Sequence, residues 1–490
     1  MSDIIKIENL DSVYNRAICE PAITQELAEY LTFMVPGAKF MPKFRARLWD
    51  GKIRLLNMRN NTFYAGLNHK ISQFAKDREY EIEHLSDFSH TEFSVVEAKK
   101  FIESLKLPIE VRDYQLKTFI RCVRQNRALV LSPTASGKSL VIYLLCRFRQ
   151  SGPHGGTLIV VPTTSLVHQM EDDFRNYSSN LIKDRFNIQK IFAGQDQCPA
   201  GHDVTISTWQ SIYKASKGWF SNFKQVIIDE AHLAQAKSLT GIMEKTPTLQ
   251  YKFGFTGTLS DSLCHEMVLE GLFGPIVKLV TTTELQKKGF LAPLRIKCIV
   301  LKYPDEQRKE VSKLDYQKEL DWLFAHQKRN NFIKNLALSL KGNTLLLFRY
   351  VDNHGIPLYN NIEAEAECPV YYVAGSVEGE VREEIRKIVE SHKKSIIVAS
   401  AGVFSTGVNI VNLHNIIFAA PSKSRIRVLQ SIGRGLRPTD SKDTCTLYDI
   451  IDDLLWKQRK NFTLRHFQDR ISLYASENFE YKIYQVNLKA

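Results

Sequence analysis

The stretch between residues 128 and 140 constrains the fold of this 490-residue chain more than any other. An apolar run, Ala-Leu-Val-Leu, ends in Ser-Pro-Thr-Ala-Ser-Gly-Lys-Ser, and a helical pattern begins at Leu140. This order predicts a strand, a phosphate-binding loop and a helix, because backbone N–H groups at a helix N-terminus cradle phosphates. Lys138 would neutralise the phosphates, and the Ser139 hydroxyl would hold Mg²⁺. The expected nucleotide-binding residues are Ser132, Pro133, Thr134, Ala135, Ser136, Gly137, Lys138 and Ser139.

The loop taken alone leaves an alternative open. Ser132 stands where the usual pattern has its first glycine, although a small residue suffices at that turn. A Gly-Lys-Ser sequence also occurs by chance on surface helices. The function therefore has to be decided by the rest of the chain.

The composition is that of an ordinary globular protein with a basic surplus. Hydrophobic residues make up 44% and charged residues 24%, and the mean hydropathy is −0.23. Lysine and arginine number 66 against 53 acidic residues, which gives a net charge of +13 and a pI of about 9.2. This surplus favours polyanions as partners, but a generically basic enzyme would show it too.

Several classes of protein are disfavoured. Eight cysteines are scattered without a Cys-x-x-Cys pair, which argues against zinc ribbons, iron–sulfur clusters and a disulfide framework. The N-terminus carries early acidic residues and does not have the pattern of a signal peptide. No apolar run approaches the ~20 residues that span a bilayer. We therefore expect a soluble, cytoplasmic protein without a membrane partner.

Residues 1–100 contain no nucleotide motif, but a basic segment within them predicts a hairpin. Asp50-Gly51 lies between two alternating runs, as is typical of a two-residue turn. Pairing across this turn would bury Leu48 opposite Ile53 and leave a basic face containing a tryptophan, which suits phosphate contacts and stacking. A merely solvated basic face is the alternative. The expected nucleic-acid contacts are Arg45, Arg47, Trp49, Lys52 and Arg54.

From Val111 onward, short apolar runs alternate with helical patterns, which is typical of parallel sheets with crossover helices. The expected strands are 128–131, 157–161, 204–207, 225–228 and 252–255 in one sheet, and 343–348, 370–373, 395–399, 415–419 and 445–449 in another. Residues 305–340 read as charged, solvated helices without a site. The predicted domains are 1–100, a small basic domain; 101–290 and 291–455, two α/β domains in tandem; and 456–490, a helical extension packed on the second.

A second motif follows the phosphate loop. The apolar run Val226-Ile-Ile ends in Asp229-Glu230-Ala-His232. Two adjacent carboxylates downstream of a phosphate loop suit a metal-bound site with a base beside it. Asp229 would hold Mg²⁺, and Glu230 would polarise the attacking water. A strand that ends in Asp-Glu by chance is the alternative, and the order of the elements disfavours it.

At this point the chain resembles superfamily 2 helicases of the DExH type, whose motifs match in order from about residue 110 to 450. The resemblance implies two RecA-like domains that use ATP and Mg²⁺. Arg112-Asp-Tyr-Gln115 resembles the element that reads adenine. The segments resembling motifs Ia and Ib imply nucleic-acid contacts by Pro162, Thr163, Thr164, Gln169, Thr208 and Gln210. Motifs II and III imply that His232, Thr256, Gly257 and Thr258 couple hydrolysis to movement along the strand.

The second half of the resemblance lies beyond residue 340. Arg349 follows a strand as in motif IV, and residues 401–410 resemble motif V. These segments imply nucleic-acid contacts by Arg349 and Ser405 and a ribose contact by Asn409, where relatives often have aspartate. Gln430, Arg434 and Arg437 belong to a segment resembling motif VI. On a helix the two arginines would share one face, and an arginine donated to a phosphoryl group is worth about 10³ to 10⁵ in rate. A surface basic helix is the alternative.

The first hundred residues, ahead of this motor, are similar to the recombination helicases of T-even phages. That resemblance implies ATP-driven unwinding and branch migration of forks, four-way junctions and R-loops in recombination, repair and replication, in the host cytoplasm. The implied partners are branched, single- and double-stranded DNA, RNA–DNA hybrids, and replication or recombination proteins. Three alternatives stay open: a duplex translocase that never separates strands, an ATP-gated clamp, and an RNA-only helicase.

Overall fold

The structure is a computed structural model, and its chain divides into two compact units near residue 280. Among the described residues, every helix is too short or too polar to cross a membrane. The described residues are 3–35, 37–86, 91–133, 136–150, 156–181, 185–192, 201–233, 236–257, 259, 266–290, 293–375, 384–385, 388–389, 391–401, 412–420, 444–476 and 479–488.

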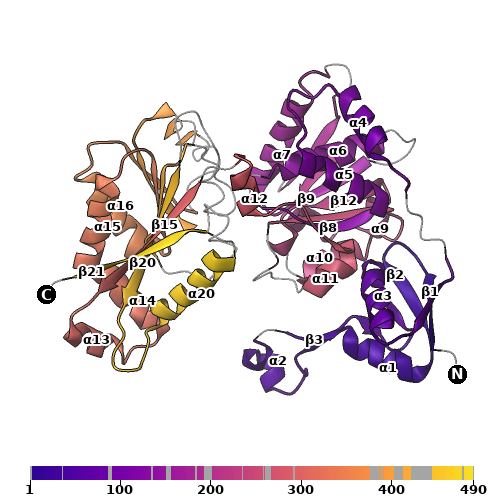
Figure 1. Cartoon of the computed structure of the whole chain (residues 1–490), viewed down its shortest axis with the longest axis horizontal. Helices are drawn as coiled ribbons and strands as arrows, with labels where there is room; N and C mark the ends of the chain where they lie inside the picture. The colour runs from indigo at the N-terminus through magenta and orange to yellow at the C-terminus, as the bar shows by residue number, and fades with distance from the viewer. Residues whose placement is uncertain are drawn as a thin grey trace. The chain divides into compact units, whose positions relative to one another are not determined.

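The first unit begins with an N-terminal module, which we define as residues 3–86. Its sheet has the strand order β5-β6-β2-β1-β7, with β1 antiparallel to β2 and parallel to β7. Helices α1 and α3 lie beside this sheet (Figure 1), and their buried apolar side chains share one core with it. The elements are β1 (Ile4–Asn9), β2 (Tyr14–Ile18), α1 (Pro21–Tyr30), β5 (Leu56–Asn57), β6 (Thr62–Tyr64), η2 (Ala65–Leu67), α3 (Asn68–Asp77) and β7 (Glu81–His84).

Within this module, residues 32–54 form a β3–β4 protrusion, and here the predicted hairpin is wrong. Strand β4 pairs antiparallel with β3, through Thr32 opposite Arg54 and Met34 opposite Lys52, and not with residues 44–49. The elements of the protrusion are β3 (Thr32–Met34), η1 (Ala38–Phe40), α2 (Pro42–Arg45) and β4 (Lys52–Arg54). Figure 1 shows α2 and β3 extending away from the β1–β2 sheet.

The cause of this error lies in the residues around the predicted turn. Pro42 occupies the first turn of α2, where its fixed φ favours a helix over a strand. Asp50 accepts a hydrogen bond from the Lys52 N–H and pairs with Arg54, so its carboxylate is used within the loop. Gly51 has a φ of 79°, and a Cβ there would lie 2.8 Å from Met34 Sδ, so the glycine serves a close approach to β3.

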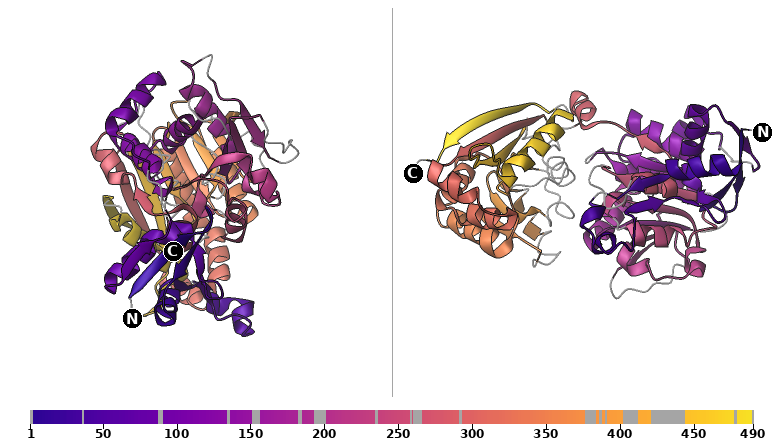
Figure 2. Two further views of the ribbon diagram at one scale, coloured as in Figure 1. Left: turned by 90° about the vertical axis from the view of Figure 1, so that its right-hand side faces the viewer. Right: turned by 90° about the horizontal axis from the view of Figure 1, so that it is seen from below.

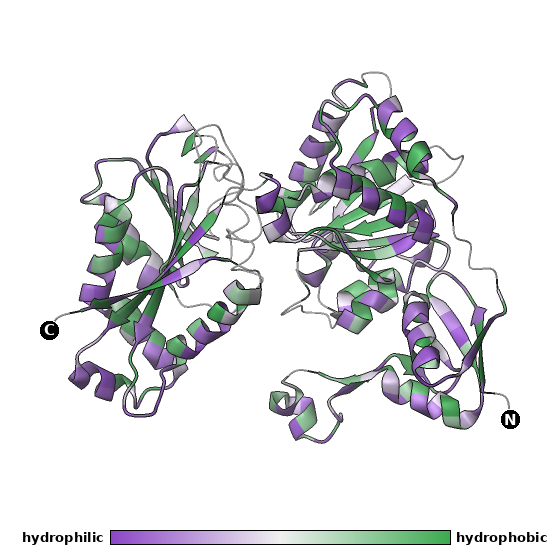
Figure 3. Ribbon diagram, viewed as in Figure 1, coloured by the Kyte–Doolittle hydropathy of each residue, from purple (hydrophilic) through white to green (hydrophobic). Residues whose placement is uncertain are grey.

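The rest of the first unit is a parallel sheet of seven described strands in the order β10-β11-β9-β12-β13-β8-β14. All five strands predicted for this sheet are confirmed, and β10 and β14 were not predicted. Figure 3 shows the strands largely in green, as expected for strands buried on both faces. The strands are β8 (Arg127–Leu131), β9 (Gly156–Val161), β10 (Ile188–Ile191), β11 (Val204–Thr208), β12 (Phe223–Ile228), β13 (Tyr251–Thr256) and β14 (Ile276–Lys278).

Helices cover both faces of this sheet. Helices α5, α6 and α7 share a core with alternate strand residues such as Ala128, Val130 and Ile227. Helices α10 and α11 pack on the opposite face, against Leu129 and Val226. The helical elements are α4 (Val95–Ser104), α5 (Asp113–Gln125), α6 (Lys138–Gln150), α7 (Thr164–Tyr177), α8 (Trp209–Ile212), α9 (Lys217–Phe220), η3 (Ala231–Leu233), α10 (Ala236–Met243) and α11 (Glu266–Phe273).

The N-terminal module is built into this sheet domain through a continuous apolar core. The same buried cluster contains Leu67 and Phe74 of the module and Leu269 and Phe273 of α11. The backbones of the module and of α11 approach each other closely at Gly66, because a Cβ there would lie 2.3 Å from the backbone oxygen of Glu270. The right-hand view of Figure 2 shows the indigo module against the purple-to-pink sheet domain. A side chain larger than glycine would force the two parts of the unit apart.

Hydrogen bonds reinforce the same junction. The Tyr14 and Tyr64 rings stack 5.4 Å apart, and both hydroxyls donate to Glu244 Oε1, at 3.1 and 2.7 Å. Arg127, the first residue of β8, donates to the Ser12 backbone oxygen at 2.7 Å. The strand that leads to the phosphate loop therefore starts at the N-terminal module.

The second unit is another parallel sheet, with the described strand order β17-β18-β16-β19-β20-β15-β21. All five predicted strands are confirmed. The expected helical extension contains α20, but it continues into β21, which pairs in parallel with β15. The elements are α12 (Thr282–Lys287), β15 (Leu294–Lys302), α13 (Asp305–Val311), α14 (Tyr316–Ala325), α15 (Gln327–Ser339), β16 (Thr344–Phe348), η4 (Val351–Gly355), α16 (Ile356–Glu363), β17 (Val370–Val373), β18 (Ile396–Ser400), β19 (Asn415–Phe418), β20 (Cys445–Asp453), α20 (Phe462–Ser476) and β21 (Tyr481–Asn487).

Two buried ion pairs fasten helices to β20. Arg329 of α15 donates to Asp452 at 2.8 Å, and neither side chain is exposed. Burial alone would lower the pKa of Arg329, but Asp452 outweighs it and raises the pKa. Arg470 of α20 pairs with Asp449 at 2.8 Å, and the Tyr474 hydroxyl donates to the same carboxylate. These charges fix the packing of α15 and α20, because an unpaired buried charge is costly.

We expect Glu270→Gln to weaken the junction between the module and the sheet domain. His69 Nε2 and Lys70 Nζ lie 2.9 and 3.1 Å from the Glu270 carboxylate, and they outweigh the effect of burial and lower its pKa. Because the glutamate pKa is lowered on folding, its contribution is complete above the unfolded value of 4.5 and is lost as pH falls through the folded value. The variant should lose about 1–3 kcal/mol of unfolding free energy at pH 7.

Urea unfolding at pH 7 and below pH 4, read by hydrogen exchange across β1 and α11, would measure this difference. Glu266→Gln is the matched control, since Glu266 lies on the same helix and is exposed. Equal losses in both variants, or a difference that persists at low pH, would contradict the assignment.

Candidate functional site

The site lies at the carboxyl ends of three adjacent strands, β8, β13 and β12. Ser132 follows β8, is fully buried, and donates its N–H to the Thr256 backbone oxygen at 2.8 Å. The Ser136 hydroxyl donates to the Pro133 oxygen at 2.7 Å, and α6 begins at Lys138. The described part of the predicted phosphate loop is therefore a turn between β8 and α6. Thr134 and Ala135 lie outside the described residues.

Lys138 meets both predicted acidic residues. Its Nζ forms an ion pair with Glu230 Oε1 and lies 3.6 Å from Asp229 Oδ1. Burial alone would lower the pKa of Lys138, but the two carboxylates outweigh it and raise the pKa. Burial, with the charge of Glu230, raises the pKa of Asp229, although Lys138 opposes this. A cation and two carboxylates are thus held together with little water.

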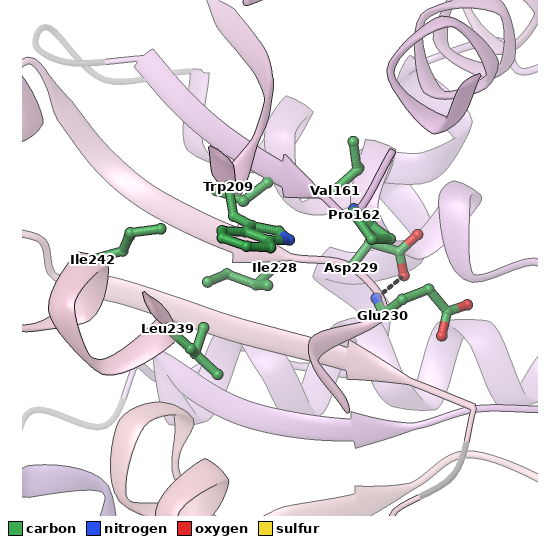
Figure 4. A pocket seen from close by; sticks show the side chains of 9 residues that line it. Val161, Pro162, Trp209, Ile228, Asp229, Glu230, Leu239 and Ile242 are labelled. Carbon is green, nitrogen blue, oxygen red and sulfur yellow. Dashed lines mark hydrogen bonds between the residues drawn. The ribbon is translucent and has the colours of Figure 1, made fainter. Parts of the chain in front are cut away.

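The backbone around the acidic pair is unusual. The Asp229 N–H continues the sheet by donating to the Val160 oxygen at 2.9 Å, whereas Glu230 leaves it with a φ of 50°. The Glu230 N–H donates to Asp229 Oδ1 at 2.9 Å (Figure 4). A positive φ is uncommon in a residue other than glycine and clusters at functional sites. It turns the chain sharply, so that two neighbouring carboxylates both reach Lys138.

The predicted coupling residues connect this acidic pair to β13. His232 is fully buried, and its Nδ1 lies 2.7 Å from Thr256 Oγ1 and 3.4 Å from Glu230 Oε2. Burial lowers the pKa of His232, so the neutral ring is favoured at pH 7. Gly257 follows β13, and Thr258 lies outside the described residues. A single imidazole therefore bridges the ends of β12 and β13.

The predicted adenine element lies against the loop. The buried Gln115 accepts a hydrogen bond from the Arg112 N–H at 3.0 Å and donates to the Gly137 oxygen at 3.3 Å. Gly137 has a φ of 79°, and a Cβ there would lie 2.3 Å from Gln115 Nε2. The Arg112 guanidinium donates to the Tyr114 hydroxyl at 2.8 Å. Sequence reasoning placed Gln115 near the base; its link to the glycine of the loop was not predicted.

Two further neighbours of the site were missed. Tyr177, at the end of α7, places its hydroxyl 2.8 Å from Ser139 Oγ, the predicted Mg²⁺ ligand. Trp209 lines a small pocket beside Asp229 and Glu230, together with Ile242 of α10 (Figure 4). No sequence signal marks the tyrosine, because its role depends on how α7 packs on α6.

The predicted motif Ia and Ib residues meet at one edge of the sheet. Strands β9 and β11 are parallel neighbours, with Val161 opposite Thr208, so the residues that follow them lie together. Thr163 caps α7 by accepting from the Leu166 N–H. Thr208 is buried and bonds to Ser211 Oγ at 2.9 Å. The side chains of Thr164 and Gln210 are exposed, while those of Pro162 and Gln169 are half-buried.

The predicted contacts of the second unit are described only in part. Arg349 follows β16, is exposed, and donates to the Tyr316 hydroxyl at 2.5 Å. The predicted residues Ser405, Asn409, Gln430, Arg434 and Arg437 lie outside the described residues.

The residues of the N-terminal module that were predicted to contact nucleic acid differ in how exposed their side chains are and in whether other residues already bind them. Arg45, Arg47 and Lys52 are exposed. Arg54 is committed to Asp50 at 2.5 Å, which helps lower the pKa of Asp50 to about 2. Trp49 is half-buried, and its Nε1–H donates to the Lys52 oxygen at 2.9 Å. The tryptophan therefore supports the loop with its polar edge.

These groups fit a Mg²⁺–nucleoside triphosphate. The N-terminus of α6, a helix of 13 residues, offers N–H groups and a partial positive charge to phosphates. Oxygen atoms of Asp229 and Ser139 are of the kind that Mg²⁺ prefers. Lys138 now neutralises two carboxylates, and phosphate oxygens of a bound nucleotide would take their place.

Two RecA-like sheets in tandem, the first carrying such a site, define an ATP-driven motor of the superfamily 2 helicase class. Three families match the chain: "DNA helicase UvsW, N-terminal" over residues 4–97, "Type III restriction enzyme, res subunit" over 100–261, and "Helicase conserved C-terminal domain" over 327–439. The chain is 36% identical to the "ATP-dependent DNA helicase uvsW" of Enterobacteria phage T4, over 99% of this chain and all of the relative.

Other comparisons agree. A solved structure of T4 UvsW covers both chains completely, with a TM-score of 0.53 and 33% identity. The "DNA 3'-5' translocase XPB2" of Sulfurisphaera tokodaii is 26% identical over 70% of this chain and 83% of the relative. A DNA-bound restriction-modification enzyme, LlaBIII, shares the fold, with a TM-score of 0.58 at 15% identity over 84% of this chain and 34% of that one. The chain belongs to the UvsW family of superfamily 2 helicases.

We expect Lys138→Ala to reduce ATP hydrolysis by about 10²-fold or more while nucleic-acid binding persists. Lys138 follows the loop after β8 and contacts the acidic pair at the end of β12, whereas the motif Ia and Ib residues follow β9 and β11. Phosphate release and DNA anisotropy would measure the two effects. Lys99→Ala, an exposed lysine on α4, is the control. Undiminished hydrolysis in the Lys138 variant would overturn the assignment of the site.

Proposed function

We propose that this protein is an ATP-dependent DNA helicase that unwinds or branch-migrates branched DNA, including forks, four-way junctions and R-loops. One observation carries the proposal: Lys138, Asp229 and Glu230 belong to the same compact unit as the N-terminal module, and that module carries a basic protrusion. A motor that only hydrolyses ATP has no need of a module fixed to it, whereas a motor that acts at DNA branches needs a part that recognises them.

The groups around Lys138 would carry out ATP hydrolysis. Bound ATP, with Mg²⁺, supplies the free energy for movement. Lys138 and the N-terminus of α6 hold the phosphates, and Asp229 and Ser139 hold the metal. We assign to Glu230, next to Asp229, the acceptance of a hydrogen bond from the attacking water. We assign to Arg434 and Arg437 the stabilisation of the transferred phosphoryl group, and to Gln430 a part in the same catalytic step.

Coupling would pass through His232. Its imidazole lies between Glu230 and Thr256, so a change in the charge around Glu230 reaches the end of β13 directly. Ser132, which donates to the Thr256 oxygen, belongs to the same network. We infer that Thr256, with Gly257 and Thr258, reports the state of the nucleotide to the nucleic-acid track.

The track would follow the edge formed by motifs Ia and Ib. Exposed polar groups such as Thr164 and Gln210 suit phosphate oxygens, and such contacts are largely independent of base sequence. Arg349 and Ser405 are the track contacts proposed for the second unit, and Asn409 is assigned to the ribose of the nucleotide. The expected substrates are branched, single- and double-stranded DNA and RNA–DNA hybrids. Their biological setting would be recombination, repair and replication in the host cytoplasm, with proteins of those processes as partners.

One experiment tests the proposal. ATP-dependent dissociation of an R-loop, a four-way junction and a simple tailed duplex should be followed in parallel for the wild type and Glu230→Gln. We expect preferential opening of the first two by the wild type only. DNA-stimulated hydrolysis without strand release would favour a duplex translocase, which the match to restriction-enzyme subunits makes the specific rival. Activity that survives in Glu230→Gln would favour an ATP-gated clamp, and stimulation by RNA alone an RNA helicase.

We expect Arg45→Gln combined with Arg47→Gln to weaken junction binding and to lower the slope of log Kd against log salt by about 2. Both side chains are exposed, whereas Arg54 is held by Asp50. Anisotropy titrations at several salt concentrations would measure the slope. Lys99→Gln combined with Lys100→Gln on α4 carries the same charge change and is the control. An equal slope in both double variants would make the basic protrusion a solvated face only.

A further inference from the structure

The β3–β4 protrusion exposes large apolar side chains at its surface. Leu48 is 79% exposed, the highest value among the large apolar side chains of the described residues, and Phe40 is 65% exposed. Met34 and Met41 are 53% and 42% exposed. The predicted hairpin would have buried Leu48 on its underside, and the observed pairing of β4 with β3 leaves it in solvent. Four exposed large apolar side chains in one short basic segment, which we call the apolar cluster of the protrusion, favour an interaction site.

The protrusion has a small core of its own that holds the backbone of this segment. Ala38 is 3% exposed, and a Cβ at Gly51 would lie 3.0 Å from its Cβ and 3.1 Å from the Phe44 ring. The Leu48 N–H donates to the Lys43 oxygen at 2.9 Å. The exposed apolar groups are therefore presented by a folded loop, and the loop belongs to a module that shares its core with the ATP-binding sheet domain.

The charge around these groups indicates the partner. The segment from residue 32 to 54 contains a single acidic residue, Asp50, and this residue is neutralised by Arg54. Basic side chains flank the apolar ones, and the Lys39 ammonium lies 5.5 Å from the centre of the Phe40 ring. The six basic residues are Lys39, Lys43, Arg45, Arg47, Lys52 and Arg54. A nucleic acid presents the complementary pair of surfaces, namely anionic phosphates and the apolar faces of its bases.

A cleft begins at the base of the protrusion. It has a volume of about 960 Å³ and lies between the module and helix α10, with Arg54, Arg59 and Lys237 among its lining residues. Asn57 and Asn60 add amide groups that can bond to phosphate or base edges. Ile53 and Arg54 of β4 line this cleft, so it adjoins the strand that closes the protrusion. A strand displaced at the protrusion would have beside it a cleft that offers Arg59, Lys237 and these amide groups to its phosphates, with Asp11 as the acidic residue of the lining.

We propose that the β3–β4 protrusion is a wedge that inserts Phe40 and Leu48 between bases at the branch point of DNA. Lysine and arginine side chains of the same loop hold the flanking phosphates, and one separated strand enters the adjacent cleft. Apolar side chains inserted between base steps, with basic residues on the phosphates, unstack DNA where it is already weakly stacked. This inference rests on the proposed helicase function and gives it a strand-separating element.

The test compares Phe40→Ala/Leu48→Ala with the wild type and with Val96→Ala, which removes an exposed apolar side chain from α4. A four-way junction carrying 2-aminopurine at the branch point reports unstacking on binding without ATP. Wild type and Val96→Ala should raise the fluorescence at least twofold, and the double variant should lose most of that rise. Opening of the junction per ATP hydrolysed should fall at least tenfold in the double variant. The single variant Phe40→Trp keeps a large ring at this position and should retain both the fluorescence rise and the junction opening.

The outcomes separate the wedge from its rivals. A wild type that binds the junction but never opens it would overturn the proposed function and the wedge together. A double variant that opens the junction and raises the fluorescence like the wild type would overturn the wedge alone. If sedimentation shows a dimer that the double variant abolishes, while junction opening is unchanged, the apolar cluster serves a second copy of the chain and the wedge is wrong.

Discussion

The site depends on one topological constraint, the order β12-β13-β8 in a parallel sheet. The strand before the phosphate loop and the strand before the acidic pair are not neighbours, because β13 lies between them. Lys138 reaches across this gap to Asp229 and Glu230, and Thr256 occupies the end of the intervening strand. Groups at the carboxyl ends of parallel strands share one edge, so the sheet places cation, carboxylates and imidazole within one cluster.

The same strands connect the site to the N-terminal module. Strand β8 begins at Arg127, which donates to the module at Ser12, and ends at the phosphate loop. Glu244, directly after α10, accepts from two stacked tyrosines of the module. Helix α10 also lines the pocket beside the acidic pair. The module is therefore part of the ATP-binding unit, and a branch held by it would be held in a fixed relation to the phosphate loop.

The predictions from sequence succeeded where the signal was local. Apolar runs such as 157–161 and 225–228 are strands because they are covered on both faces, and a buried strand needs no alternation with polar residues. The hairpin around Asp50-Gly51 failed because the partner of β4 is β3, almost twenty residues earlier. The chain between them holds Pro42 at a helix start and Gly51 at a close contact, and neither role is visible without the partner strand.

The sequence by itself determined the chemistry: a phosphate loop ending in Lys138-Ser139, an acidic pair after an apolar strand, and the α/β class with two sheets. These features are set by residue types at short spacing, because a loop, a strand and a helix each depend on near neighbours in the chain. Only the tertiary structure decided that Tyr177 faces Ser139, that Gln115 contacts Gly137, and that the module shares a core with α11. It also decided that Leu48 lies in solvent. These facts depend on contacts between residues far apart in the chain, and burial and close approach are properties of the packed structure alone.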